Sequence, residues 1–487
     1  MGRVTEPNQV LPVPPADLPA TLGALRAAGH HYRTVKQELR DNLLARLRAG
    51  GDRFPGIVGY DDTVLPEVER ALLAGHDMVL LGERGQGKTR LIRSLVALLD
   101  EWTPVIAGSV LNEHPMHPLT PASRALAAEA GDDLPVAWLH RSMRYGEKLA
   151  TPDTSVGDLI GDVDPIRIAQ GRTLGDPETI HFGLVPRTNR GIFAVNELPD
   201  LAERIQVALL NVLEERDIQV RGYQLRLPLD LLLVASANPE DYTNRGRIIT
   251  PLKDRFGAEI HTHYPLGLEL ELALIRQEAD LVADVPEHVL EVLARFARAV
   301  RDSPSVDQRS GVSARFAIAA AETVAAAALR RSGLLAAGAT TDGAREETPV
   351  ARVGDAVSVT STLRGKVEFE SGEDGREVEI LAHLLRTATA DTFRARLAGL
   401  DLSGFTALVD DGRVVETGEL VASAELLRQV GTVPGLAKAL DRLGLGGAPT
   451  PEQAAAGVEF VLEGLHLTRR LGKDVTDSGR TVYGGRG

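Results

Sequence analysis

The chain contains no cysteine among its 487 residues. Disulfide bonds, thiolate zinc sites and cysteine nucleophiles are therefore excluded, and this absence is typical of cytosolic proteins. No uninterrupted apolar run reaches the ~18 residues of a membrane-spanning helix. Residues 1–20 are rich in proline and lack the apolar segment of a signal peptide. We expect a cytoplasmic protein without a membrane span.

Positive charge is also scarce. The 54 lysine and arginine residues face 68 aspartate and glutamate residues, which gives a net charge of −14. An acidic chain is poorly suited to neutralising nucleic-acid phosphates over a wide surface, so general nucleic-acid binding is disfavoured, although a local basic patch stays possible. The apolar fraction of 43% is ordinary for a globular protein, and the length predicts about three domains.

One glycine-rich stretch carries the clearest chemistry. The apolar run Val79–Leu81 leads into a Gly-x-x-x-x-Gly-Lys-Thr pattern, and an amphipathic helical pattern follows. This is a P-loop in its expected strand–loop–helix context, where glycines let backbone N–H groups surround phosphates. Lys88 would lie on the β- and γ-phosphates, and the Thr89 hydroxyl would ligate Mg²⁺. A glycine-rich turn without nucleotide is the alternative. The residues expected at the ATP are Gly82, Gly85, Gln86, Gly87, Lys88, Thr89 and Arg90.

Two later apolar runs end in polar residues, as nucleotide-binding strands do. Ile192–Val195 precedes Asn196 and Glu197 in a Walker B pattern, whose first residue holds the water shell of Mg²⁺ and whose second polarises the attacking water. Leu231–Ala237 precedes Asn238, which could bridge the γ-phosphate and water as a sensor-1 residue. Singly, each could be a solvated strand end or a turn. Their order behind a P-loop favours an ATP-Mg site.

Two arginines complete the predicted site. Arg255 ends a short helical pattern, from which it could reach the γ-phosphate of a neighbouring subunit, and Arg245 and Arg247 are alternatives just upstream. Arg315 opens a long alanine-rich helical pattern and would lie over the phosphates as a sensor-2 arginine. A surface ion pair is the plain alternative for such an arginine.

The wider pattern predicts four regions. Strands that alternate with helices predict an α/β fold with a parallel sheet. Thr103–Gly108 is expected as the second strand along the chain, Val350–Glu370 also has strand-like alternation, and the tail from Lys473 is expected to be disordered. A pair of histidines, His114 and His117, lies in a proline-rich loop with no further ligand nearby, which disfavours a metal role. The expected regions are an N-terminal arm and helical element (1–50), a nucleotide-binding domain (51–265), a helical lid (266–335) and a mixed α/β C-terminal region of unknown role (336–487).

Residues 54–331 resemble the AAA+ ATPases of the magnesium-chelatase I-subunit and MoxR branch. The resemblance implies a P-loop αβα sandwich with a helical lid, and it places Ile57 and Val58 beside the adenine. It also implies a homo-oligomeric ring, usually a hexamer, which uses ATP-Mg to remodel a protein partner that often carries a von Willebrand factor A domain. Beyond the P-loop, the resemblance is carried by residues 54–59, 150–153 with Gly157 and Leu159, 183–185, 189–191 and 237–241.

The chain departs from that family in two places. Walker B usually begins with aspartate, but here Asn196 stands at that position, so we expect weaker Mg²⁺ binding and slower hydrolysis, and Asn196→Asp should lower the Mg²⁺ concentration required. The C-terminal third does not match a chelatase I-subunit. An ATPase subunit of a magnesium or cobalt chelatase, and an ATP-binding scaffold with little hydrolysis, therefore stay open beside the remodelling ATPase. A sigma-54-type activator is disfavoured, because the chain lacks the Gly-Ala-Phe-Thr-Gly-Ala loop and an obvious helix-turn-helix.

Overall fold

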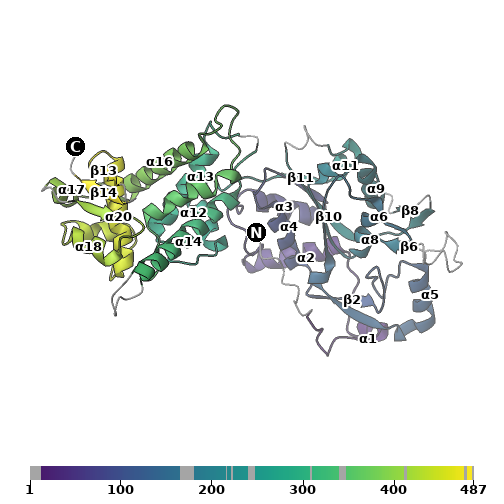
Figure 1. Ribbon diagram of the computed structural model, residues 1–487. Helices are drawn as coiled ribbons and strands as arrows, with labels where there is room; N and C mark the ends of the chain where they lie inside the picture. The colour runs from purple at the N-terminus through teal and green to yellow at the C-terminus, as the bar shows by residue number, and fades with distance from the viewer. Residues whose placement is uncertain are drawn as a thin grey trace. The chain divides into compact units, whose positions relative to one another are not determined.

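The computed structural model describes residues 12–164, 180–214, 217–220, 223–239, 247–307, 310–338, 347–410, 414–476 and 480–484. The chain divides into two compact units, whose helices and strands Figure 1 labels and colours by residue number. Unit 1 comprises Met1–Glu83 and Gly87–His263, and unit 2 comprises Arg84–Gln86 and Tyr264–Gly487. No helix in the described ranges is both long and apolar enough to span a bilayer.

A five-stranded parallel sheet forms the centre of unit 1, with the strand order β11-β1-β10-β7-β4. The three inner strands are fully buried, which explains why the sequence shows them as continuous apolar runs and not as alternating ones. The strands are β1 (Met78–Leu81), β4 (Tyr145–Leu149), β7 (Gly191–Asn196), β10 (Leu231–Ala237) and β11 (Ala258–His261).

Successive residues of these strands point to opposite faces of the sheet. On β1, Val79 and Leu81 pack into one apolar cluster together with α9, whereas Met78 and Leu80 pack into another with α2, α3 and α4. Helices therefore cover both faces, and the predicted α/β sandwich is confirmed. The helices of unit 1 are α1 (Leu22–Ala27), α2 (Val35–Ala49), α3 (Val64–Ala74), α4 (Lys88–Ser94), α5 (Pro121–Ala130), α6 (Val156–Leu159), α8 (Leu184–Arg187), α9 (Glu203–Glu214) and α11 (Thr250–Arg255).

The predicted second strand is present, but it lies outside the central sheet. β2 (Trp102–Ile106) covers most of Thr103–Gly108, but it pairs antiparallel with β3 (Val136–His140) outside the central sheet. The strand beside β7 is β4, whose half-exposed residues lack an apolar run. Two further hairpins pair β5 (Gly161–Val163) with β6 (Ile180–Phe182), and β8 (Asp217–Val220) with β9 (Tyr223–Arg226).

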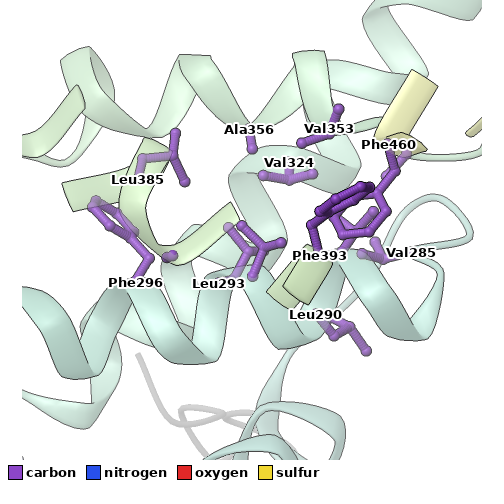
Figure 2. Packing of buried hydrophobic residues seen from close by; sticks show 14 of the residues in the cluster. Val285, Leu290, Leu293, Phe296, Val324, Val353, Ala356, Leu385, Phe393 and Phe460 are labelled. Atoms are coloured by element: carbon purple, nitrogen blue, oxygen red, sulfur yellow. The ribbon is translucent and has the colours of Figure 1, made fainter. Parts of the chain in front are cut away.

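Unit 2 is mainly helical and has one continuous core that extends from Leu272 on α12 to Tyr483 on β14. Figure 2 shows Phe296 and Leu293 of α13 packed with residues of later helices, including Phe393 and Phe460. The C-terminal region thus packs on the helices that follow the sheet, a point that the sequence left open. The helices are α12 (Leu268–Glu278), α13 (Glu287–Arg301), α14 (Ala314–Gly338), α15 (Ser358–Thr362), α16 (Glu377–Leu397), α17 (Ser403–Asp410), α18 (Ser423–Val430), α19 (Leu436–Arg442) and α20 (Pro451–Leu467).

Two predictions for this region were wrong. Val350–Glu370 forms short helical turns and α15, with no strand. The tail from Lys473 is partly ordered, because β13 (Gly472–Val475) and β14 (Thr481–Gly484) pair with each other, and β14 also pairs with β12 (Val415–Thr417). The pairing of β12 with β14 joins segments more than 60 residues apart, so local composition does not reveal it.

Candidate nucleotide-binding site

The predicted nucleotide-binding segments meet at one edge of the central sheet. Leu81 pairs with Ala237, and Ala235 pairs with Val195, so the carboxyl ends of β1, β10 and β7 lie side by side. The P-loop follows β1, Asn238 follows β10, and Glu197 follows β7. In open α/β sheets this edge is the usual place for a ligand.

The P-loop connects β1 to α4 through residues with left-handed backbone conformations. Gly85 has φ 75°, and Gly87 has φ 80° as the N-cap residue of α4. Glycine adopts these conformations without a Cβ penalty. Lys88 is buried in the first turn of α4, and its Nζ donates hydrogen bonds to the carbonyls of Gly82 and Glu83. The lysine therefore lies within the loop where a phosphate would be bound.

The segment expected at the adenine lies beside the same helix. The Arg90 side chain, on α4, donates from Nε to the Gly56 carbonyl over 3.0 Å. Ile57 closes a turn on Phe54, with a backbone hydrogen bond of 3.1 Å, and is half-buried, as is Val58. The structure thus brings the Ile57–Val58 segment, Arg90 and the P-loop helix together.

Asn196 stands directly opposite Thr89. The Thr89 hydroxyl donates to Asn196 Oδ1 over 3.3 Å, and the buried Ser236 hydroxyl donates to the same oxygen over 3.2 Å. Two oxygen atoms, from Thr89 and Asn196, therefore lie together next to the P-loop. Because Mg²⁺ prefers oxygen ligands and retains several waters, this donor set fits the metal that the fold family implies.

A carboxylate from the neighbouring strand adjoins this pair. Asn196 Nδ2 donates to Glu147 Oε1 over 2.7 Å. Arg93 makes two hydrogen bonds to Glu147, of 2.8 and 2.9 Å, and the Tyr145 hydroxyl makes a third of 2.9 Å. Burial raises the pKa of Glu147, but the hydrogen bonds from Arg93, Tyr145 and Asn196 outweigh this effect and hold the pKa below its usual range. The carboxylate is therefore ionised at neutral pH.

Glu197 has a strained backbone. Its φ is 55° and ψ is 50°, a left-handed conformation that a non-glycine residue seldom adopts, and strain of this kind is concentrated at functional sites. Its backbone N–H donates to the Ser236 hydroxyl over 3.4 Å. One buried serine thus contacts both Walker B residues.

Asn238 offers a buried acceptor. The residue is 3% exposed, and its Oδ1 has no hydrogen-bond partner among the residues that the structure describes. A buried carbonyl oxygen normally has a partner, so this position fits a bound water or ligand. The sensor-1 prediction for Asn238 rests on this observation and on its place at the end of β10.

The predicted arginines that the structure describes are exposed. Arg255 is the exposed last residue of α11, and Arg247 is also exposed. Arg315 is exposed in the first turn of α14, in unit 2. Arg245 lies outside the described residues. The roles of Arg255 and Arg315 at the phosphates stay predictions.

The histidine pair is part of a loop, as expected, and packs with a third histidine. His114 Nδ1 accepts a hydrogen bond from the Met116 N–H, so neutral His114 carries its proton on Nε2 and donates it to His30 Nε2 over 3.2 Å. Burial lowers the pKa of His114 to about 2. This ring has no nitrogen left for a metal, and no metal-binding group of His, Cys, Asp and Glu occurs in the described part of the chain.

Four residues of the site were missed from the sequence, namely Glu147, Tyr145, Arg93 and Ser236. Glu147 and Tyr145 lie on β4, and their position depends on the pairing of Leu149 with Asn196. Arg93 follows Thr89 by four residues on α4, so the two share one face of the helix. The spacing of four residues between Thr89 and Arg93 is the one signal in the sequence that could have identified a residue of this set.

No family model matches the chain. The "Magnesium-chelatase subunit ChlI" of Nostoc sp. is 30% identical over 235 residues, which cover 47% of this chain and 59% of that protein. The "Magnesium-chelatase 38 kDa subunit" of Cereibacter sphaeroides is 29% identical over 240 residues, covering 47% and 64%. The chain thus spans about three fifths of these relatives. A cryo-EM-based structure of the BchI–BchD complex of magnesium chelatase is 22% identical with a TM-score of 0.35, covering 67% of this chain and 98% of that one.

Proposed function

We propose that this chain, an AAA+ ATPase of the magnesium-chelatase I-subunit and MoxR branch, binds ATP-Mg and hydrolyses it to remodel a protein partner. The active form would be a homo-oligomeric ring, a hexamer on the family pattern, and the partner would carry a von Willebrand factor A domain. The observation that carries the proposal is the hydrogen bond between Thr89 and Asn196, which joins the P-loop helix to the Walker B strand at the edge of the sheet.

Each residue would have one task in this reaction. The P-loop backbone and Lys88 hold the phosphates, and Thr89 with Asn196 holds Mg²⁺ and its waters. The bound metal would neutralise phosphate charge. Glu197 accepts a proton from the attacking water, while Asn238 orients that water against the γ-phosphate. Neighbouring subunits would contribute Arg255, and the lid would contribute Arg315.

Two other functions have specific support. An ATPase subunit of a metal chelatase is favoured by the magnesium-chelatase relatives, although they match the chain over less than half of its length. An ATP-gated scaffold with little hydrolysis is favoured by Asn196, since an amide carries no charge. Metal insertion into a porphyrin, tested with the copurifying partner present, would identify the chelatase.

Turnover of ATP by the purified chain separates an enzyme from a scaffold. Glu197→Gln should lower turnover by about 10²–10⁴-fold, the usual effect of losing a general base, and should leave ATP binding intact. Lys88→Met is the matched control, because it should abolish binding itself. Equal background turnover in the unaltered chain and in Glu197→Gln would reject hydrolysis and favour the scaffold.

A ring can be tested through Arg255. If this exposed residue acts on a neighbour's nucleotide, Arg255→Ala should lose turnover by about 10³-fold while it binds ATP normally. Mixing Arg255→Ala with Glu197→Gln should restore part of the turnover, because each subunit supplies what the other lacks. Full activity of Arg255→Ala alone would exclude this residue and point to Arg247.

A further inference from the structure

The structure assigns Glu147 a part in the metal site: we propose that it supplies from β4 the negative charge that Asn196 lacks and fixes the orientation of the Asn196 amide. The inference rests on the proposed ATP-Mg site. It concerns a residue that no motif of the P-loop, Walker B or sensor type includes.

The first step concerns orientation. An asparagine side chain has a donor end and an acceptor end, whereas an ionised carboxylate can only accept. Because Glu147 Oε1 lies 2.7 Å from the Asn196 amide, the NH₂ group must face Glu147. The amide oxygen then faces the hydroxyls of Thr89 and Ser236. Glu147 thus presents the oxygen of Asn196 to the side where an aspartate oxygen would normally lie.

The second step concerns charge. The Glu147 side chain is 20% exposed, and its Oε2 accepts from Arg93 and Tyr145, while its Oε1 accepts from Arg93 and Asn196. Arg93 and Thr89 belong to the same face of α4, so the bonds Thr89–Asn196–Glu147–Arg93 form a closed circuit between α4, β7 and β4. A carboxylate is therefore fixed one hydrogen bond behind Asn196. The carboxylate of a usual Walker B aspartate therefore has a counterpart on the neighbouring strand, where it is paired with Arg93.

This arrangement changes the expectation for Asn196→Asp. An aspartate at this position would place its carboxylate against that of Glu147, at a separation where two like charges repel. The single substitution should therefore destabilise the metal-free protein. Glu147→Gln combined with Asn196→Asp should remove the clash, because the glutamine amide can donate to the new aspartate while the total charge of the pair is unchanged.

The test measures binding of a fluorescent ATP analogue to the full chain, with Mg²⁺ titrated from zero in one series and EDTA present in another. Glu147→Gln should raise the Mg²⁺ concentration for half-maximal binding by about tenfold, as expected for losing a charged hydrogen-bonding partner, and should leave binding in EDTA unchanged. The double variant should return to the value of the unaltered chain or below it. Glu129→Gln, an exposed glutamate on α5, is the matched control and should change neither series.

An unchanged Mg²⁺ requirement in Glu147→Gln would overturn the inference and leave Glu147 as a surface ion-pair partner of Arg93, which contributes little. Equal loss of binding with and without Mg²⁺ would also overturn it, since that result indicates a role in folding. The absence of Mg²⁺-dependent binding in the unaltered chain would instead reject the ATP-Mg site itself. Melting temperatures without metal give a second measurement: Asn196→Asp should melt lower than the double variant.

Discussion

The two units each bury a group of polar and charged side chains, but the two groups differ in what surrounds them. In unit 2, the Arg352 side chain is 2% exposed and donates to the Val421 carbonyl and the Ser423 hydroxyl. Glu459 lies 3.8 Å away and accepts from the Gly354 N–H. This group joins the turn before α15 to α18 and α20, and the chain surrounds it on all sides.

In unit 1, by contrast, the polar group lies where three strands end. Asn196 and Ser236 contact Thr89 of the P-loop helix, Glu197 next to them has a left-handed backbone, and the Asn238 oxygen lacks a partner among the described residues. Burial and hydrogen bonding alone do not distinguish the two groups. Backbone strain and an unused acceptor do, and they indicate a site prepared for a ligand.

The comparison predicts that the group around Arg352 in unit 2 contributes to the stability of the fold and not to nucleotide binding. Arg352→Met would leave Glu459 buried without its cation, which should lower the free energy of unfolding by about 3–5 kcal/mol. Both tryptophans, Trp102 and Trp138, lie in unit 1. The unfolding transition followed by helical circular dichroism should therefore move to a lower denaturant concentration. The transition followed by tryptophan fluorescence, which reports on unit 1, should not move.

Arg394→Met is the control for Arg352→Met, because Arg394 is exposed on α16 and pairs with an exposed aspartate. It should change the free energy of unfolding by less than about 1 kcal/mol. If Arg352→Met altered nucleotide affinity while stability stayed the same, the two groups would not differ in the way described.

A second prediction concerns acid. His288 on α13 is fully buried and packs on Phe460, with ring centroids 4.9 Å apart, and burial lowers its pKa to about 3. The unfolded chain, with a pKa near the usual 6.5, then binds the proton more readily than the folded one. The stability contribution is complete above pH ~6.5 and is lost as the pH falls towards about 3, by roughly 1.4 kcal/mol for each pH unit.

His288→Leu should therefore flatten the pH dependence of unfolding between pH 6.5 and 4, as measured by denaturant titrations of the helical signal. His383→Leu, on the exposed face of α16, should keep the original dependence. If the pH dependence of unfolding were unchanged in His288→Leu, protons would have access to this part of unit 2 in the folded state.

The parts of the site that follow from adjacent residues were predicted from sequence, and the parts that depend on strand pairing were not. Gly82–Thr89, Asn196–Glu197 and Asn238 are visible because the chemistry requires a glycine loop or a polar residue directly after an apolar strand. Glu147 is not visible, because its role depends on which strand lies beside β7. Thr103–Gly108 shows a strand pattern, whereas the half-exposed β4 shows none, so the sequence did not reveal which strand pairs with β7.

The same difference between local features and long-range strand pairing applies to the fold. The buried strands β1, β7 and β10 were predicted near their observed bounds, since apolar runs are local. The three-stranded sheet that contains the tail was missed because it joins β12 to β13 and β14 across α18, α19 and α20. Helix α20 was also missed, although the sequence contains its start signals: Thr450 and Gln453 form a capping box, and Pro451 is the first helical residue.

The smallest predicted effect, at Ser236, tests the comparison most directly. This buried hydroxyl accepts from the Glu197 N–H and donates to the Asn196 oxygen, while Thr89 would still contact Asn196 without it. Ser236→Ala should therefore reduce ATP turnover by about fivefold, equivalent to one hydrogen bond of ~1 kcal/mol, through looser placement of Glu197. Ser94→Ala is the control, because the Ser94 hydroxyl bonds the Leu91 carbonyl within α4, and it should keep normal turnover.

A loss of thermal stability in Ser236→Ala with unchanged turnover would mean that the polar group of unit 1, like the one around Arg352, only stabilises the fold. A loss of turnover at equal stability would mean that the strand ends are arranged for the reaction, because a purely structural hydrogen bond would affect folding first.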